Sequence, residues 1–572
     1  MYVTYETNPY FIDQATFTVQ RHTQPPKLFS TLPKNSNEFM PTKLVRISDM
    51  QVIDGSTVNE GYCALSYSWS WCGENGIKDD IQSGKTLRVD NGKHKIIFPA
   101  KTVRPKSRGR KKTISAKVKF VKFEGIIQQI GKDFNIKYIW YDQMCIDQAD
   151  MEEKHHEISR MHQIYSSASC TIVLVPELRT EMWSHNMGTY RAIRTIGLSH
   201  SDWMKRMWTL GETMMSPKLL FVGQDTYMSG TTAIEWASLG ALADKPSQWN
   251  AATILYYAHA RGCTKEHDRV FALANLYPNI MEKITINYDQ PILDLLLLFY
   301  KLLAQEDLSV LCFGRDGEFY KDIQQNAFGS QNRMYDTDRT NIIPIRKYDL
   351  PSWTGVAGQH ELYGGGTSTG LWKSNFKNYS IDGRFMNVHC TPIWSIDDPR
   401  STINIDPFTA IDPKDLPYLP EEKHDSYNTL AVKVQFPGCR NPKVMHARFH
   451  QPSSKNQELN RTLITERMAL LSLFMPINKE QFFWVENQSK LDADGTLTCF
   501  VPSLTEQIDY SAKYAILYGI SFQDDKNGKE KMYPIVRQDG DYYKAVGHCL
   551  ISNAEDFFSD YTLLPEQTFI IH

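Results

Sequence analysis

Apolar positions in the first part of the chain alternate between short continuous runs and stripes of helical period. The runs Tyr62–Tyr67, Tyr138–Tyr141 and Thr171–Val175 predict strands. The last of them is uninterrupted and rich in β-branched residues, which is typical of a strand covered on both faces. A fourth run, Leu219–Val222, favours one more strand.

Two helices are predicted between these strands. Phe123–Phe134 carries apolar residues three or four positions apart along its whole length. Asp150 and Glu153 have the spacing of a capping box, so a second helix is predicted to begin there. One face of that helix would carry Ile158, Met161, Ile164, Tyr165 and Ala168. Strand, helix, strand, helix, strand in this order predicts an α/β domain with a parallel β-sheet flanked by helices.

The character of the sequence changes along the chain, which predicts four regions. Residues 1–42 are polar and are expected to form an N-terminal arm, and residues 43–250 hold the α/β domain. Helical periodicity predicts a helical extension over 251–355. Residues 356–572 alternate apolar runs with Gly and Pro, which predicts a β-rich C-terminal domain. Within the α/β domain, Asn91-Gly92 predicts a hairpin over 86–98.

Composition and charge exclude several classes of protein. The chain has 572 residues, 41% of them hydrophobic, and a net charge of −2, so no global attraction to nucleic acid or to an anionic membrane is expected. Ten Lys or Arg residues and no acid lie in 101–122; a solvated insertion is favoured there over a patch for phosphate-bearing partners. The most apolar stretch, Pro291–Leu303, is short and contains Asp294 and Lys301, so a core helix is expected rather than a membrane span.

The spacing of the cysteines and histidines indicates the cellular compartment of the protein and whether it has a metal site. The ten cysteines include no C-x-x-C pair, which is typical of reduced thiols in a cytoplasmic protein, and no secretory signal is recognisable at the N-terminus. His155, His156 and His162 have no Cys or carboxylate partner at ligand spacing, so no metal site is predicted.

Polar and aromatic side chains gather where two of the predicted strands end. Ser66 and Tyr67 end the first strand and Trp69 lies just after it, while Asp142 and Cys145 follow the second strand. Parallel sheets bind ligands at the carboxyl ends of their strands, so these side chains are candidates for a binding site. The alternative is that each set only anchors its loop by hydrogen bonds.

A third stretch, Arg206–Glu212 (RMWTLGE), carries the most chemistry. On a helix, Glu212 would lie one turn from Trp208, and burial beside the indole would raise the pKa of its carboxyl, while Arg206 would oppose that shift. A fixed carboxylate at a ligand edge can hold ribose hydroxyls and stabilise an oxocarbenium-like centre. The alternative is that Glu212 pairs with Arg206 or caps a backbone group.

In order and spacing, several segments resemble the heterokaryon-incompatibility (HET) domain of filamentous fungi. They are YCALSYSW, KYIWYDQMCIDQ, RMWTLGE, RGCTKEHDRVFALANL and LPSW, spread over roughly residues 43–360. The chain departs from the usual pattern at Ser70 (usually Gly), Asp147 (usually Asn) and Gly211 (usually Gln). The resemblance implies a TIR/flavodoxin-like fold and a role in self/non-self recognition, innate immunity and programmed cell death.

HET domains are in turn similar to TIR domains, whose NAD⁺-cleaving members use the Glu of a W-C-x-x-E motif. By that resemblance Glu212 would be the catalytic carboxylate and NAD⁺ the substrate, with no cofactor implied. Ser66, Tyr67 and Trp69 would line the cleft with Asp142 nearby. Two functions stay open: an NAD⁺ glycohydrolase, or a non-catalytic module that binds protein partners or itself. A plain metabolite-sensing pocket is a third reading.

Overall fold

The structure is a computed structural model, and it divides the chain into two compact units, each described here by itself. The first is Met1–Ser247 with Ala260–Leu295, and the second is Gln248–His259 with Leu296–His572. The described residues are 10–12, 19–21, 39–68, 93–98, 101–103, 112–114, 117–175, 178–184, 191–196, 198, 201, 203–223, 226–229, 250–259, 261–314, 348–360, 372–397, 427–446, 469–477, 481–486, 498–524 and 530–572.

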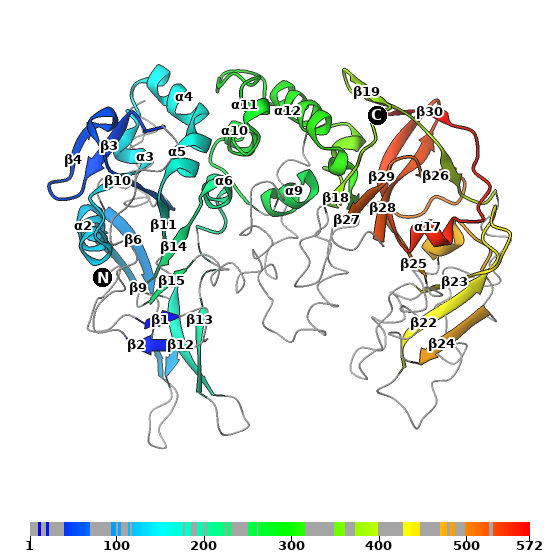
Figure 1. The fold of residues 1–572 in the computed structure, drawn as a ribbon, viewed down its shortest axis with the longest axis horizontal. Helices are drawn as coiled ribbons and strands as arrows, with labels where there is room; N and C mark the ends of the chain where they lie inside the picture. Colours follow the sequence, from blue (N-terminus) through cyan, green and yellow to red (C-terminus); the bar gives the residue numbers. More distant parts are fainter. Residues whose placement is uncertain are drawn as a thin grey trace. The chain divides into compact units, whose positions relative to one another are not determined.

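A mixed sheet forms the centre of the first unit (Figure 1). Its middle strands lie side by side in the order β10 (Tyr138–Trp140), β5 (Cys63–Tyr67), β11 (Cys170–Leu174) and β14 (Leu219–Val222), and all four run parallel. These are the four strands that the sequence predicts. Their parallel pairing confirms the expected α/β character of this part of the chain.

The outer strands of this sheet are mostly antiparallel. Strand β3 (Lys43–Arg46) pairs with β10, and β4 (Gln51–Asp54) pairs with β3 at the edge of the sheet. Beyond β14 lie β15 (Thr226–Ser229), β1 (Tyr10–Ile12) and β2 (Val19–Arg21), of which only β1 runs parallel to its neighbour β15. The sheet is therefore wider than predicted and is not parallel throughout.

Helices of the first unit lie on this sheet or on one another. They are α2 (Phe123–Phe134), α3 (Asp142–Cys145), α4 (Met151–Ser159), α5 (Met161–Ser167), α6 (Met207–Met215), α10 (His267–Ala274) and α11 (Pro278–Met281). Helix α2 has the bounds predicted for it. Asp150 caps α4 as predicted, accepting hydrogen bonds from the backbone N–H groups of Glu152 and Glu153. The second predicted helix is divided at Arg160 into α4 and α5.

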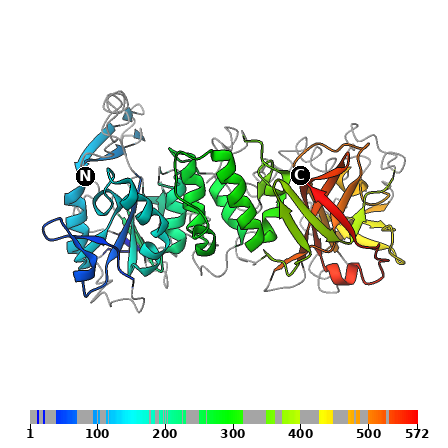
Figure 2. The same ribbon diagram turned by 90° about the horizontal axis from the view of Figure 1, so that it is seen from above.

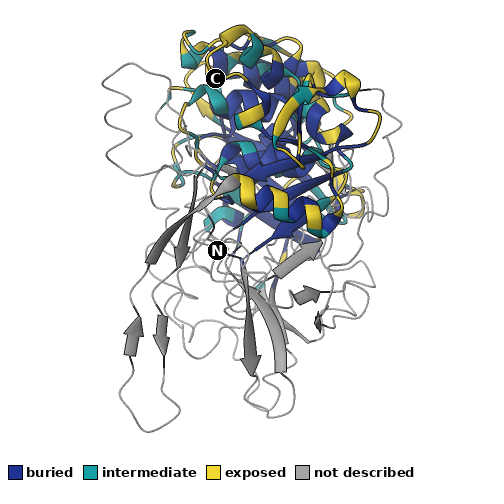
Figure 3. Ribbon diagram, turned by 90° about the vertical axis from the view of Figure 1, so that its left-hand side faces the viewer, coloured by how far each residue is buried: buried dark blue, intermediate teal, exposed yellow. Residues whose placement is uncertain are grey.

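The order of the strands determines which helices share a face. From β5 the chain passes through α2 to β10 on one side, and then through α4 and α5 to β11 on the other side of β5. Because crossovers between parallel strands are right-handed, α2 lies on one face and α5 and α6 lie on the opposite face. Helices α5 and α6 contact each other, and α6 also contacts β5 and α10. Buried residues follow the strands, whereas exposed residues lie on the outer sides of the helices (Figure 3).

Short hairpins extend from the first unit. Strand β6 (Lys93–Phe98) pairs with β9 (Lys117–Lys122), β7 (Lys101–Val103) pairs with β8 (Lys112–Ile114), and β12 (Arg179–Ser184) pairs with β13 (Arg191–Ile196). The Asn91-Gly92 turn of the predicted hairpin lies outside the described residues. The basic stretch 101–122 thus contributes backbone to two hairpins.

The second unit is rich in strands (Figure 2, yellow to red). Its described strands are β16 (Phe313–Gly314), β17 (Gln359–His360), β18 (Trp372–Lys373), β19 (Tyr379–Asp382), β20 (Phe385–Cys390), β21 (Pro392–Trp394), β22 (Tyr427–Val434), β23 (Lys443–His446), β24 (Phe482–Glu486), β25 (Thr498–Leu504), β26 (Tyr514–Leu517), β27 (Phe522–Asp524), β28 (Glu530–Asp539), β29 (Tyr542–Ser552) and β30 (Gln567–Ile571). Its helices include α9 (Ala251–His259), α17 (Ala554–Phe557) and most of α12 (Ile292–Glu306). The β28–β29 hairpin turns at Gly540, whose φ of 62° favours glycine.

Candidate functional site

The end of β5 and the first turns of α6 meet in the first unit. The Ser66 hydroxyl donates a short hydrogen bond to Glu212 Oε2, and it accepts one of 2.7 Å from Trp203 Nε1. An indole N–H can only donate, so Ser66 accepts from Trp203 and its own proton is available for Glu212. All three side chains are buried, with Glu212 exposed by 7%. The direction of the Ser66 hydroxyl is therefore fixed by Trp203.

The environment of Glu212 favours the neutral carboxyl. Burial is the main reason that the pKa of Glu212 is raised to about 8, and the charge of Asp142 raises this pKa as well. The hydrogen bond from Ser66 and the charges of Arg206 and Arg261 act in the opposite direction. The Tyr165 hydroxyl, which lies beside this carboxyl, donates to the Leu65 carbonyl oxygen at 3.2 Å. A single positive charge bound near Glu212 would lower its pKa toward neutrality and favour the carboxylate.

The end of β10 contributes the second acidic side chain. Asp142 begins α3, and its Oδ1 accepts hydrogen bonds from the Tyr67 hydroxyl at 3.1 Å and from the Gln143 N–H at 2.8 Å. Tyr67 lies next to Ser66 on β5, and Asp142 influences Glu212 through its charge. Ser66, Tyr67, Asp142 and Glu212 therefore lie in one region, at the carboxyl ends of adjacent parallel strands.

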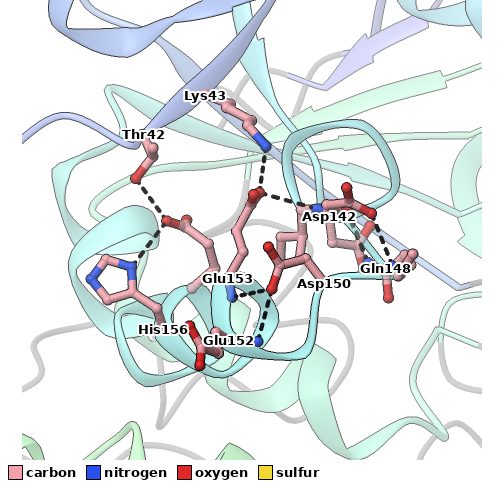
Figure 4. Close-up of polar contacts among 12 residues, drawn as sticks. Thr42, Lys43, Asp142, Gln148, Asp150, Glu152, Glu153 and His156 are labelled. Atoms are coloured by element: carbon pink, nitrogen blue, oxygen red, sulfur yellow. Dashed lines mark hydrogen bonds and ion pairs between the residues drawn. The ribbon is translucent and has the colours of Figure 1, made fainter.

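The loop after Asp142 is held by an ion pair from the edge of the sheet (Figure 4). Lys43 contacts Glu153 with an N–O distance of 2.5 Å, and Glu153 also accepts the Asp147 N–H at 3.2 Å. Glu153 therefore fixes this loop, and does not bond back to the cap residue as the predicted capping box requires. The Asp147 carboxylate accepts the Ala149 N–H at 2.9 Å, a turn that Asn can form equally well. The departure at Asp147 thus preserves the loop.

Beside Glu212 on α6, Trp208 is oriented by a second acidic group. Its indole hydrogen-bonds to Asp268, whose Oδ1 also accepts from the Tyr288 hydroxyl at 2.7 Å. Burial raises the pKa of Asp268, while these two hydrogen bonds lower it. Arg261 donates to the Arg206 carbonyl oxygen at 3.0 Å and to Thr209 Oγ1 at 2.8 Å, and so joins the start of α6 to the segment before α10.

The predicted site residues separate into three groups. Six of them lie in this region: Ser66, Tyr67, Asp142, Arg206, Trp208 and Glu212. Cys145 is buried in the hydrophobic core, and burial raises the pKa of its thiol to about 12, so this thiol stays protonated. Trp69, like Ser70, lies outside the described residues.

Sequence reasoning missed several side chains that hold this region together, namely Trp203, Tyr165, Arg261 and Asp268. A signal for Trp203 existed, since a buried indole N–H needs a partner and this Trp lies just before the RMWTLGE stretch. Asp268 and Arg261 belong to the segment RGCTKEHDRVFALANL, where nothing in the spacing pointed to Trp208 or Thr209.

Comparison with known protein families shows that part of the chain matches one of them. Residues 62–195 match the family model described as Heterokaryon incompatibility protein (HET). Over this range the chain is similar to HET domains. No curated protein and no solved structure matches the chain significantly. The matched range includes β5, β10 and β11 but ends before α6, so the position of Glu212 beside Ser66 rests on the fold rather than on the match.

Metal clusters, membrane-spanning helices and disulfides are absent from the described residues. Among them, no group of three or more His, Cys, Asp and Glu side chains is placed to hold a metal ion. None of the helices in the described ranges combines the length and the apolar character needed to cross a membrane. Among the described cysteines there is no disulfide, and each of them except Cys263 is buried.

Replacing Trp203 by Phe is expected to lower the free energy of unfolding by about 1–3 kcal/mol, because the Ser66 oxygen loses its buried donor. The Phe ring retains the edge contact with Phe221, which limits the packing loss. Urea unfolding of variant and wild type measures the change. Trp140→Phe is the matched control, since it removes a buried indole N–H that has no hydrogen-bond partner among the described residues. Equal losses in the two variants would contradict the role given to Trp203.

Proposed function

We propose that the HET-like domain of this protein hydrolyses NAD⁺ and that Glu212 is its catalytic carboxylate. The observation that carries the proposal is the meeting of Glu212 with Ser66 and Asp142 at the carboxyl ends of parallel strands. The order of the four parallel strands supports it further, because flavodoxin-like sheets of this order bind ligands where the chain reverses direction, here between β5 and β11. The W-T-L-G-E spacing of Trp208 and Glu212 resembles the motif of NAD⁺-cleaving TIR domains.

In the proposed reaction the bond between ribose C1′ and the nicotinamide nitrogen breaks. The bonding electron pair leaves with nicotinamide, which becomes neutral, and the ribose ring takes up the positive charge as an oxocarbenium-like centre. The Glu212 carboxylate stabilises that charge and accepts hydrogen bonds from ribose hydroxyls. Water then attacks C1′, loses a proton, and gives ADP-ribose.

The raised pKa of Glu212 fits a cationic substrate. Without ligand the buried carboxyl is mostly neutral at pH 7, since its pKa is about 8. The positive nicotinamide ring would favour ionisation of Glu212 when it arrives, so that the negative charge is present when it is needed. Ser66, held by Trp203, would direct its proton at Oε2 and keep the carboxylate in place.

The proposal is tested by incubating the full-length protein with NAD⁺, at high dilution and clustered on beads or vesicles. Nicotinamide and ADP-ribose are expected in equal amounts, and faster when the chains are clustered, since we propose that assembly completes the site. If NAD⁺ stays intact under both conditions, the enzymatic proposal is wrong. The other reading, a non-catalytic module that signals by binding partners, would then stand.

A further inference from the structure

Lys154 is a half-buried cation at the end of the first turn of α4. Among the described residues its ammonium group makes no hydrogen bond and no ion pair. Its neighbour Glu153 is engaged by Lys43 instead. Removing part of the water from an ammonium group costs free energy unless a partner replaces that water. An unpaired ammonium in this position therefore indicates a ligand.

A second cation, Lys265, lies close to Lys154. Lys265 Nζ is 4.2 Å from the centre of the Tyr288 ring, and that ring is 6.0 Å from the ring of His155, the residue next to Lys154. Burial lowers the pKa of Lys154, and the charge of Lys265 lowers it further. The two ammonium groups thus repel each other, and an anion between them would relieve that repulsion.

The carboxylates in the neighbourhood are already in use. Asp142 accepts from Tyr67 and from the Gln143 N–H, and Asp268 accepts from Tyr288 and Trp208. Both act on Lys154 through their charges, but neither lies within ion-pair distance of it. Since Trp208 lies in the first turn of the helix that carries Glu212, these lysines belong to the same edge of the sheet.

We propose that Lys154 and Lys265 bind the pyrophosphate group of a dinucleotide whose ribose lies against Glu212. This assignment rests on the proposed function and names the part of the substrate that gives it affinity. Two compact, mobile ammonium groups suit a diphosphate bridge, to which each donates charge-assisted hydrogen bonds. The nearby charges of Asp268 and Asp142 act to raise the pKa of Lys154 and so favour its protonated form.

The test is calorimetric titration of the full-length protein with ADP-ribose, with inorganic pyrophosphate as a competitor. Lys154→Gln and Lys265→Gln are each expected to weaken ADP-ribose binding by about tenfold or more, and to make the remaining affinity less sensitive to salt. Lys154→Arg retains the charge and is expected to bind more tightly than Lys154→Gln. Inorganic pyrophosphate should displace ADP-ribose from the wild type and do so poorly from the Gln variants.

Lys132→Gln is the matched control, because Lys132 is exposed on α2, on the opposite face of the sheet. It should bind ADP-ribose within about twofold of the wild type, as expected for a distant surface charge. Lys154→Gln should unfold at or above the wild-type temperature, which excludes misfolding as the cause of weaker binding. If Lys154→Gln binds ADP-ribose as tightly as Lys132→Gln does, or if the wild type does not bind ADP-ribose at all, the proposed pyrophosphate site is wrong.

The two proposals can fail separately. ADP-ribose binding without NAD⁺ cleavage would overturn the proposed function alone. NAD⁺ cleavage with an unchanged KM in Lys154→Gln would overturn the assignment of the lysines alone.

Discussion

Replacing Glu212 by Gln is expected to lower kcat/KM for NAD⁺ cleavage on the order of 10³-fold, because the developing positive charge loses its carboxylate. Gln has nearly the same shape and can still accept the Ser66 hydrogen bond, so the fold is expected to persist. The measurement is the initial rate of nicotinamide release by clustered full-length protein. In the wild type this rate should rise with pH as Glu212 ionises; with a pKa of about 8 for the free protein, kcat/KM should increase roughly fiftyfold from about pH 6 to about pH 8.

The matched control is Glu282→Gln, which removes an exposed carboxylate that follows α11 in the same unit. It should leave the rate and its pH dependence unchanged. Two results would contradict the role of Glu212: cleavage by the Gln variant at the wild-type rate, or a wild-type profile that is flat between about pH 6 and pH 8. If cells expressing Glu212→Gln die as readily as those expressing the wild type, signalling does not depend on the chemistry.

The parts of the fold that were predicted correctly are those whose signal is local. Helix α2 has a complete stripe of apolar residues, and β11 is buried at every position, so periodicity alone identifies both. The order of these elements then indicates parallel pairing, because a helix between two strands forms a crossover. The proximity of Ser66 and Asp142 follows from the same argument, since both lie at carboxyl ends of neighbouring strands.

The parts that were missed depend on contacts between distant residues. The edge strands β3 and β4 are short, and β4 is largely exposed, so no continuous apolar run marks it. No Pro or Gly in the sequence marks the break between helices α4 and α5 at Arg160. The hydrogen bonds from Trp203 to Ser66 and from Trp208 to Asp268 join positions 137 and 60 residues apart, and no spacing rule predicts such partners.

One departure from the family pattern gains a physical meaning from the structure. Gly211 is buried where α6 contacts α10, and a Cβ at this position would meet the Ala272 carbonyl oxygen at 3.4 Å. The Met215 side chain would lie at the same distance from that Cβ, so a larger residue here would begin in van der Waals contact with both α6 and α10. The close approach of α10 also places Asp268 beside Trp208. Gly211 therefore fits the close packing of α6 against α10 in this chain.

Glu212→Gln is also expected to stabilise the first unit at alkaline pH. The folded-state pKa of Glu212, about 8, lies above the ordinary value of 4.5, so the unfolded chain releases this proton first. The stability contributed by the neutral carboxyl is complete below about pH 4.5 and is lost as the pH rises to about 8, at close to 1.4 kcal/mol per pH unit and on the order of 3–5 kcal/mol in total. Gln cannot ionise and avoids this loss.

The advantage of Glu212→Gln over the wild type should therefore grow from about pH 5 to about pH 8 and stay constant above that. Urea unfolding at several pH values measures it, with hydrogen exchange in β11 and α6 reporting on the first unit alone. Glu282→Gln should show no such growth, because that carboxylate is exposed in the folded protein. A stability difference that is the same at every pH would mean that Glu212 ionises as readily in the folded chain as in the unfolded one. Burial would then not hold its proton, and the link between this carboxyl and a cationic substrate would be lost.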